Sequence, residues 1–376
     1  MSHQVALNHH AAKQPVVVLA SVSTGYAAQR GKPRIVTEGI DVSLRAGELT
    51  CLLGPNGAGK STLMRTIAGM QPPLTGVVRI DGRDVLQMSA RELARVVSVV
   101  LTDRAPTGML SAYALVALGR HPHTNWLGKL TDADHAVIRQ AMTITGAAEL
   151  ADRLVSELSD GERQRVMVAR ALAQEPRTMV LDEITAFLDL PRRVEIMGML
   201  RQLAHETGRA VLLSTHDLDL ALRASDRIWL LPKNGQLTIG APEDLVLSGS
   251  LEAAFAIDGL QFEPERGTFR IRSIQRGRLQ VQGSGLARLW TVRALERAGY
   301  AIVDEPTSTL PRVRVEATGS AARDARMSWL IESDELWFWS TLPLVTFILS
   351  GALLILLGGV GWLVTGVQRM RSRRRK

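Results

Sequence analysis

The sequence predicts an α/β core that binds a phosphate group, followed by a small α+β C-terminal domain and a single hydrophobic transmembrane-type helix. Three observations support this fold class. Gly54–Thr62 has the sequence G-P-N-G-A-G-K-S-T, which is a glycine-rich phosphate-binding loop. The apolar run Thr178–Leu181 indicates a buried parallel strand, and Val211–Ser214 indicates another strand. Finally, Leu336–Gln368 contains no charged residue.

The length and composition suit a folded chain of two or more domains, with 376 residues of which 46% are hydrophobic and 22% charged. Residues 1–14 lack the apolar core of a signal peptide, so we expect a flexible leader on a chain whose bulk is not exported. The single cysteine, Cys51, cannot form an intrachain disulfide, which fits a reducing cytosol.

The phosphate-binding loop is the first candidate site. Its glycines allow backbone N–H groups to turn inward on phosphate oxygens, Lys60 reaches the β- and γ-phosphates, and the Ser61 hydroxyl ligates Mg²⁺. Many classes of nucleoside triphosphatase share this loop. Its candidate ATP contacts are Gly54, Pro55, Asn56, Gly57, Ala58, Gly59, Lys60, Ser61 and Thr62.

A second candidate anion site follows about a hundred residues later, where Leu158–Glu162 has the sequence L-S-D-G-E. Ser159 and Gly161 precede the helical run Arg163–Gln174, so a hydroxyl and a bare amide lie at a helix N-terminus. Two phosphate sites far apart in one chain indicate that ATP is sandwiched between two copies of the protein, a homodimer.

Two carboxylates, Asp182 and Glu183, end the predicted strand at Thr178–Leu181. In that position Asp182 can hold the Mg²⁺ shell, while Glu183 polarises the attacking water as general base. The alternative for this pair is a solvated strand end without catalytic function.

The order of the phosphate loop, L-S-D-G-E, the L-D-E that ends in Glu183 and the late histidine of Thr215-His216-Asp217 resembles the ATP-binding cassette family of transporter ATPases, over roughly residues 15–262. The resemblance implies a RecA-like core with antiparallel β and α-helical subdomains, ATP as substrate and Mg²⁺ as cofactor. It also implies that His216 contacts the γ-phosphate, that Asp189 lies at the dimer interface, and that Tyr26 stacks on adenine. A structural histidine and an ordinary surface tyrosine are the alternatives.

The sequence departs from the family pattern at several positions. Asp160 and Glu162 stand where glycine and glutamine are usual, and Ile184 replaces the usual proline. Thr102, in S-V-V-L-T-D-R, occupies the position of a glutamine that contacts Mg²⁺ in the family. Because threonine is the shorter side chain, Thr102 is the weakest of the three candidate metal ligands, with Asp103 or a bridging water as alternatives.

Two stretches resemble one importer subfamily. Leu118–Gly128 (L-G-R-H-P-H-T-N-W-L-G) and Ser214–Leu222 are similar to ATPases that power the uptake of iron–siderophore complexes, haem and cobalamin. The resemblance implies multi-span permease subunits as partners, an indirect role for a substrate-binding protein, and a location at the cytoplasmic face of the cell membrane. The alternative is a membrane-anchored ATPase with another cargo or a mechanical or signalling role.

Residues 263–336 are expected to form the small accessory domain, because segments with strand alternation flank one with helical spacing. We expect a regulatory or dimer-supporting role for it, since its sequence contains no nucleophile, metal cluster or glycine loop. The segments are Thr268–Arg272, Arg278–Gln282, Leu286–Ala298 and Arg312–Ala317.

Residues 337–368 are expected to form the hydrophobic membrane segment, since Leu342–Val367 is nearly continuously apolar and a span needs roughly 20 residues. A buried globular helix is the alternative, and the topology of the segment stays open. Six of the eight net positive charges lie in the tail, residues 369–376. Beside an apolar segment such a tail favours membrane lipid as partner and not nucleic acid.

Overall fold

The computed structural model describes most of the chain between residues 14 and 340 and divides it into two compact units, Met1–Arg270 and Ile271–Lys376. The described residues are 14–28, 32–101, 109–186, 188–233, 236–256, 260–264, 267–271, 277–303, 310–318, 326–333 and 336–340.

A six-stranded sheet forms the centre of the first unit. Five of its strands are parallel, and β10 pairs antiparallel with β9 at one edge. The strands, in spatial order, are β10 (Thr238–Gly240), β9 (Arg227–Leu230), β3 (Leu49–Leu53), β8 (Ala210–Ser214), β7 (Thr178–Asp182) and β6 (Val97–Val100).

Every residue of β3, β7 and β8 is buried, as the apolar runs predict for strands covered on both faces. The carboxyl ends of these three neighbouring strands lie side by side. The residues that follow them, including the phosphate loop, Glu183 and His216, therefore start from one edge of the sheet.

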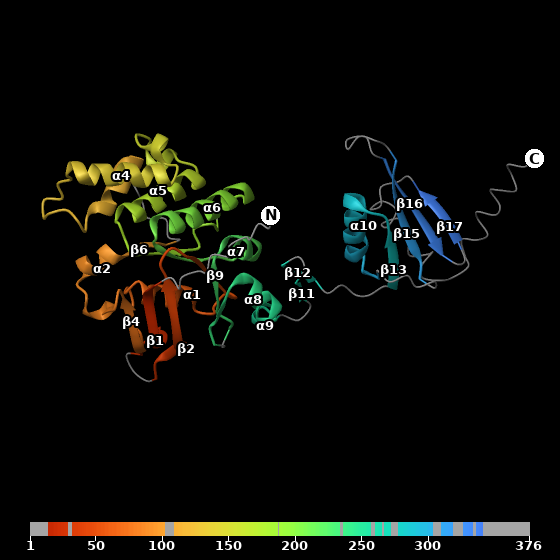
Figure 1. Ribbon diagram of the computed structural model, residues 1–376, viewed down its shortest axis with the longest axis horizontal. Helices are drawn as coiled ribbons and strands as arrows, with labels where there is room; N and C mark the ends of the chain where they lie inside the picture. The colour runs from red at the N-terminus through yellow and green to blue at the C-terminus, as the bar shows by residue number, and fades with distance from the viewer. Residues whose placement is uncertain are drawn as a thin grey trace, which may run out of the picture. The chain divides into compact units, whose positions relative to one another are not determined.

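A four-stranded antiparallel sheet covers another part of the first unit. Figure 1 shows its larger strands on the opposite side of the unit from helices α4 and α5. This arrangement agrees with the expected antiparallel and helical subdomains around a RecA-like core. The strands are β2 (Arg34–Arg45), β1 (Pro15–Tyr26), β4 (Thr75–Ile80) and β5 (Arg83–Asp84).

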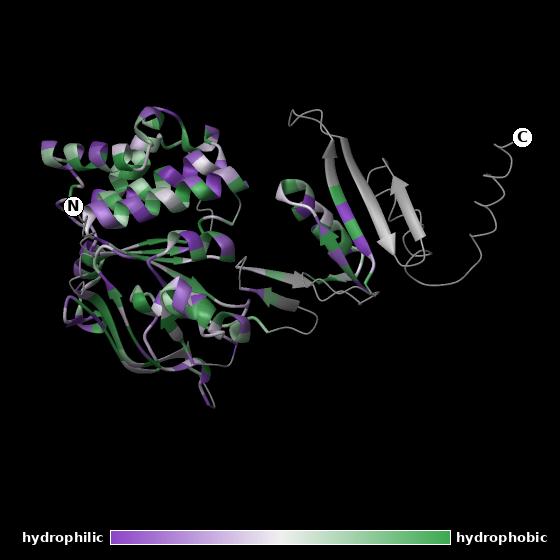
Figure 2. Ribbon diagram, turned by 45° about the vertical axis from the view of Figure 1, so that its right-hand side comes forward, coloured by the Kyte–Doolittle hydropathy of each residue, from purple (hydrophilic) through white to green (hydrophobic). Residues whose placement is uncertain are grey.

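The helices of the first unit alternate hydrophobic and hydrophilic residues along their length (Figure 2). Their apolar faces join the strands in two buried clusters, so this unit has a substantial core on both sides of the central sheet. The helices are α1 (Lys60–Ile67), α2 (Ala90–Val96), α3 (Ala112–Ala117), α4 (Asp132–Ile144), α5 (Asp160–Ala173), α6 (Leu190–Thr207), α7 (Leu218–Ala224), α8 (Pro242–Leu247) and α9 (Ser250–Ala254), with 3₁₀ turns η1 (Val85–Gln87), η2 (Leu118–Arg120), η3 (Ala148–Leu150) and η4 (Val155–Glu157).

The second unit is a mixed sheet with one helix. Strand β13 pairs in parallel with both β14 and β15, and the remaining pairs are antiparallel. Helix α10 packs on β13 and β15 through Leu295, Leu279 and Val313. In chain order its elements are β13 (Gly277–Gln282), α10 (Gly285–Arg297), β14 (Tyr300–Ile302), β15 (Arg312–Thr318), β16 (Arg326–Ser333) and β17 (Leu336–Ser340). The preceding two-stranded pair, β11 (Leu260–Glu263) and β12 (Thr268–Ile271), packs on the core of the first unit through Phe262 and Phe269.

One part of the predicted fold class is wrong. The sequence places a transmembrane-type helix from residue 337 onward, but Leu336–Ser340 forms β17, which pairs antiparallel with β16. No helix within the described ranges is long and apolar enough to cross a membrane. Residues 341–368 of the expected segment and the basic tail lie outside the described residues.

Candidate functional site

The phosphate loop connects β3 to α1, which begins at Lys60. A Cβ atom on Gly54 would lie 2.1 Å from the carbonyl oxygen of Leu231, the residue directly after β9. The loop therefore requires glycine at this point. Gly59 caps α1 with a left-handed φ of 103°, a conformation that side chains with a Cβ rarely adopt. The backbone is thus shaped to expose the amides at the start of α1.

Lys60 folds back over the loop that precedes it. Its Nζ donates to the carbonyl oxygens of Gly54 at 2.8 Å and Pro55 at 3.3 Å. Burial lowers the pKa of the Lys60 ammonium, while the carboxylates of Glu183 and Asp182 oppose that shift. The cation is therefore close enough to the carboxylate pair to interact with it electrostatically.

The other predicted residues of the loop lie around the start of α1. Ser61 is partly buried in the first turn, and the Ala58 amide donates to the Pro55 carbonyl at 3.3 Å. The Tyr26 hydroxyl, at the end of β1, lies 3.5 Å from the Thr62 hydroxyl. Because 48% of Tyr26 is exposed, its ring is accessible beside the loop, as a base-stacking residue requires.

Asp182 is the last residue of β7 and Glu183 follows it directly, so both lie at the strand end where the sequence places them. The Ser214 hydroxyl on the neighbouring strand donates to Asp182 Oδ1 at 2.6 Å and accepts the Glu183 backbone N–H at 3.0 Å. Glu183 has a left-handed φ of 49°, and its Oε1 lies 2.6 Å from His216 Nε2. Hence two of the three residues predicted to be catalytic, Glu183 and His216, contact each other directly, and Lys60 is the third.

Sequence reasoning did not identify Ser214. Its function in the site depends on pairing between β7 and β8, in which Asp182 lies opposite Ser214. A signal was present, because polar residues at the ends of neighbouring parallel strands meet at one sheet edge. The order of those strands, however, is not readable from local spacing.

The second predicted anion site lies at the start of α5, where Ser159 is the N-cap. Its hydroxyl and backbone N–H both donate to Glu162 Oε2 at 2.8 Å, and the Glu162 N–H donates to the Ser159 hydroxyl at 3.4 Å. These bonds form a capping box. Donation from the Ser159 backbone and hydroxyl lowers the pKa of Glu162, and Arg153 Nη1 pairs with its other oxygen at 2.8 Å.

Gly161 and Asp189 lie at the starts of two different helices. Gly161 is buried in the first turn of α5 and faces the Arg192 side chain, whose Cδ would be 3.3 Å from a Cβ at this position. Asp189 is the N-cap of α6 and accepts the Arg192 N–H at 3.1 Å. Thr102, the third predicted metal ligand, lies outside the described residues.

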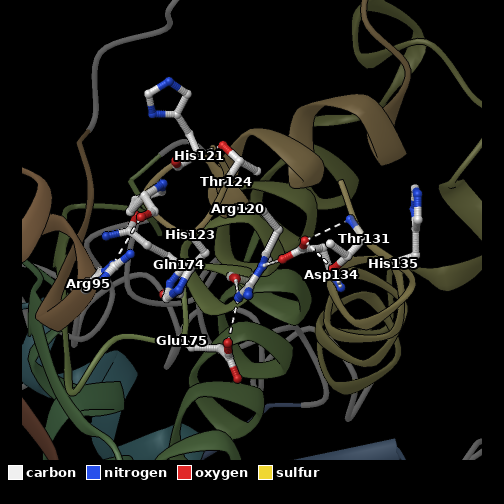
Figure 3. Close-up of polar contacts among 12 residues, drawn as sticks. Arg95, Arg120, His121, His123, Thr124, Thr131, Asp134, His135, Gln174 and Glu175 are labelled. Carbon is white, nitrogen blue, oxygen red and sulfur yellow. Dashed lines mark hydrogen bonds and ion pairs between the residues drawn. The ribbon is translucent and has the colours of Figure 1, made fainter. Parts of the chain in front are cut away.

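A buried arginine fixes the beginning of the Leu118–Gly128 segment (Figure 3). Arg120 is 6% exposed, and its Nε donates to Asp134 Oδ1 at 2.8 Å. Its Nη1 donates to the Ala173 carbonyl at 2.8 Å and to Glu175 Oε2 at 2.6 Å. Asp134 in turn accepts from the hydroxyl and N–H of Thr131 at the start of α4. One guanidinium therefore joins the start of α4 to the end of α5.

Two family models match the chain. The model described as ABC transporter matches residues 37–186, and the model described as iron ABC transporter C-terminal domain matches residues 276–336. The second match covers β13 to the beginning of β17, which places these strands and α10 in one family-defined domain.

The chain is also similar to individual ABC transporter proteins. The chain is 38% identical over 239 residues to an uncharacterized ABC transporter ATP-binding protein of Methanocaldococcus jannaschii, covering 64% of this chain and 82% of the relative. It is 37% identical to the iron(3+)-hydroxamate import ATP-binding protein of Bacillus subtilis, covering 60% and 84%. It is 34% identical over 325 residues to the cobalamin import ATP-binding protein of Halobacterium salinarum, covering 80% and 81%.

Solved structures share the fold of the first unit. An inward-facing putative metal-chelate type ABC transporter has a TM-score of 0.56 at 24% identity and covers 68% of this chain and 96% of its own, a likeness of fold. A dimeric bacterial ABC transporter cassette has a TM-score of 0.51 at 25% identity, covering 60% and 98%. Together with the phosphate loop at the end of β3 and the carboxylates at the end of β7, these matches show that the chain belongs to the ATP-binding protein family of ABC transporters.

Proposed function

We propose that the chain is the ATP-hydrolysing subunit of an importer that takes up an iron complex, such as a ferric siderophore or haem, or cobalamin through a separate permease. The observation that carries this proposal is the pairing of a cassette site with an iron-transporter C-terminal domain at residues 276–336. Relatives named for import of iron(3+)-hydroxamate and cobalamin, and for transport of ferric enterobactin, support the same cargo class.

The proposed chemistry follows from the end of the central sheet. The loop amides and Lys60 hold the phosphates of ATP, and Glu183 polarises the attacking water as general base. His216 orients the Glu183 carboxylate through their 2.6 Å contact and faces the γ-phosphate. Tyr26 stacks on adenine beside the loop. These roles require only that ATP enters with its phosphates on the amides at the start of α1.

The residues present also fit Mg²⁺, which prefers oxygen ligands. Ser61 offers a hydroxyl at the start of α1, and Asp182 offers a carboxylate whose orientation Ser214 fixes at 2.6 Å. The bound ion would supply neutralisation of the charge that develops on the β- and γ-phosphate oxygens. Orienting and ligating that ion is the task we assign to Ser61 and Asp182.

We further propose a homodimer in which Ser159 and Gly161 of one copy serve the nucleotide held by Lys60 of the other. The dimeric cassette among the similar structures supports this arrangement. Asp189, at the start of α6, would then lie at the contact between copies.

The permease is proposed to dock beside α2 and the Leu118–Gly128 segment, with a substrate-binding protein acting only through the permease. A cleft of about 530 Å³ lies there, and Trp126 and Leu127 at its edge are 90% and 65% exposed. Contiguous exposed apolar side chains beside a cleft are typical of interaction surfaces. Docking there would hold the ATPase at the cytoplasmic face of the cell membrane.

Uptake measurements in the native host test the proposal. Deleting the gene should abolish uptake of radiolabelled ferric hydroxamate or of cobalamin, and the unmodified gene should restore it, whereas a Glu183→Gln gene should not. These two cargoes and haem are assayed in parallel, so the result also identifies the cargo class. Unchanged uptake of ferric hydroxamate, haem and cobalamin in the deletion strain would contradict the proposed import function.

A further inference from the structure

Arg193, in the first turn of α6, connects two loops of the candidate site. Its Nε donates to the Leu188 carbonyl at 2.7 Å, in the loop that runs from Glu183 to Asp189. Its Nη1 lies 3.4 Å from Asp217 Oδ2, in the loop that carries His216. The guanidinium thus contacts the segment before α6 with one nitrogen and the segment before α7 with another.

A second contact joins the same two loops independently. The hydroxyls of Thr185 and Thr215 lie 3.5 Å apart and are buried. The Thr215 hydroxyl also accepts the Asp217 N–H at 3.1 Å, and Asp217 caps α7 by accepting the Leu220 N–H at 3.2 Å. The loop of His216 is therefore held at its base by α7 and from the side by the loop of Glu183.

These groups line one cleft of about 440 Å³, together with Glu183 and His216. Arg193 is the only arginine or lysine among the described residues that line this cleft. A shift of Leu188 relative to α6 would change the contact of Arg193 with Leu188, and with it the contact with Asp217. His216 directly precedes Asp217 in the chain, so the position of Asp217 bears on that of His216.

We propose that Arg193 is a positioning residue for catalysis, which couples the Leu188–Asp189 end of its loop to His216 through Asp217. The inference rests on the proposed ATPase function. When a second copy contacts Asp189, a shift of this loop is passed through the guanidinium to the loop of His216, and so to the contact between His216 and Glu183. Turnover thereby depends on a residue outside the set that we propose to hold ATP and the attacking water.

Arginine suits this position better than lysine. A guanidinium offers several N–H donors in a fixed planar arrangement, so it can serve a carbonyl and a carboxylate on different sides at once. A lysine ammonium could keep the charge next to Asp217 but cannot hold both acceptors with the same fixed geometry. The charge alone is therefore not sufficient for the proposed coupling.

The experiment compares steady-state ATPase kinetics of the full-length protein with Arg193→Gln, Asp217→Asn and the double variant. Asparagine is as good an N-cap as aspartate, so Asp217→Asn removes the charge and keeps the cap of α7. We expect Arg193→Gln to lower kcat about tenfold with KM for ATP changed less than about twofold, because the phosphate loop is untouched. The double variant should be no slower than the slower single variant, since both remove one link.

Arg201→Ala is the matched control, because Arg201 is an exposed arginine on the same helix. It should keep the kcat and the thermal midpoint of the unmodified protein. If Arg193→Gln does not fold, Arg193→Lys replaces it and should also lose turnover while keeping ATP binding.

A kcat for Arg193→Gln or Arg193→Lys equal to that of Arg201→Ala overturns the inference, as do losses that multiply in the double variant. Absence of magnesium-dependent ATPase activity in the unmodified protein would instead count against the proposed function. The two failures are therefore distinguishable.

Discussion

At the scale of single residues, the arrangement around Glu183 is the most constrained. Its backbone adopts a left-handed φ of 49°, which is uncommon for a residue with a long side chain, and its carboxylate contacts His216. Uncommon backbone conformations concentrate at functional sites, where the surrounding structure holds them. Here the Ser214 hydroxyl and carbonyl both accept the Glu183 N–H and keep the backbone in place.

Replacing Glu183 with Gln should leave ATP binding intact and reduce turnover by at least about 100-fold, the usual contribution of a general base. The amide keeps the size of the side chain but cannot accept a proton from water. Steady-state phosphate release and nucleotide binding measured on the same preparation test this. Normal turnover of the variant would remove Glu183 from the role of base.

Replacing Ser214 with Ala should raise the Mg²⁺ concentration needed for half-maximal activity by about tenfold, because groups that orient metal ligands typically contribute 10–100-fold to metal affinity. The variant loses the hydroxyl that donates to Asp182 Oδ1. Ser225→Ala is the control, since Ser225 is also buried but bonds within α7 and its end. Identical Mg²⁺ titration curves for Ser214→Ala and Ser225→Ala would contradict the role of Ser214 in orienting Asp182.

At the scale of elements, the junction of α4 and α5 depends on the buried ion pair of Arg120 and Asp134, with side chains 7% and 9% exposed. Breaking a buried pair from one side leaves a charge without its partner and costs about 3–5 kcal/mol. Arg120→Gln should therefore lower the free energy of unfolding by about 3 kcal/mol. Arg83→Gln, which breaks the exposed pair with Glu92, should cost less than about 1 kcal/mol. Denaturant unfolding of both full-length variants tests the contrast.

The same junction gives a pH dependence. Hydrogen bonds from the Thr131 hydroxyl and N–H, together with Arg120, lower the pKa of Asp134 to about 2 from 3.8. The ionised carboxylate stabilises the folded state, and this contribution is complete at pH values above the pKa of Asp134 in the unfolded chain. It is lost as the pH falls from about 4 towards 2 and the carboxylate is protonated. Asp134→Asn should therefore cost about 2 kcal/mol at pH 7 and progressively less below pH 4. A cost that does not change with pH would contradict a charged Asp134.

Elements with clear periodicity were predictable from the sequence. The run Thr178–Leu181 corresponds to β7, and Leu286–Ala298 corresponds to α10 to within a residue at each end. The strand β17 was missed because an uncharged run of aromatic and apolar residues is compatible with either a helix or a strand. In Leu336–Ser340, pairing with β16 decides for the strand, which local composition does not encode.

In the candidate site too, residues in local motifs were predictable, whereas residues placed by contacts between distant segments were not. The phosphate loop, Asp182, Glu183 and His216 stand out by spacing along the chain. Ser214 and Arg193 do not, because their contacts join segments that only the order of strands β3, β8 and β7 brings together. Motifs therefore gave the groups proposed to meet the nucleotide, while the groups that orient them required the fold.

At the scale of the whole molecule, hydrolysis is expected to need two chains. A Lys60→Ala chain lacks the phosphate lysine, and a Ser159→Arg chain lacks the hydroxyl offered to its partner. Each should be inactive alone. A mixture should recover about a quarter of the unmodified activity, because random pairing makes half the dimers mixed and each has one intact composite site. Mixtures in which mixed dimers form but no activity returns would contradict the sandwich.

The capping box at the start of α5 has a consequence for how long such a sandwich lasts. The Ser159 hydroxyl has one hydrogen, and Glu162 already holds it at 2.8 Å. A γ-phosphate from the other copy would have to replace the Glu162 carboxylate as the acceptor of the Ser159 O–H, which would leave two anions near one helix end. In the proposed dimer Glu162, where the family usually has a neutral glutamine, would therefore compete with the nucleotide for the Ser159 hydroxyl. In the proposed dimer this competition would shorten the closed state, and after loss of the γ-phosphate the Ser159 hydroxyl would again donate to Glu162 alone.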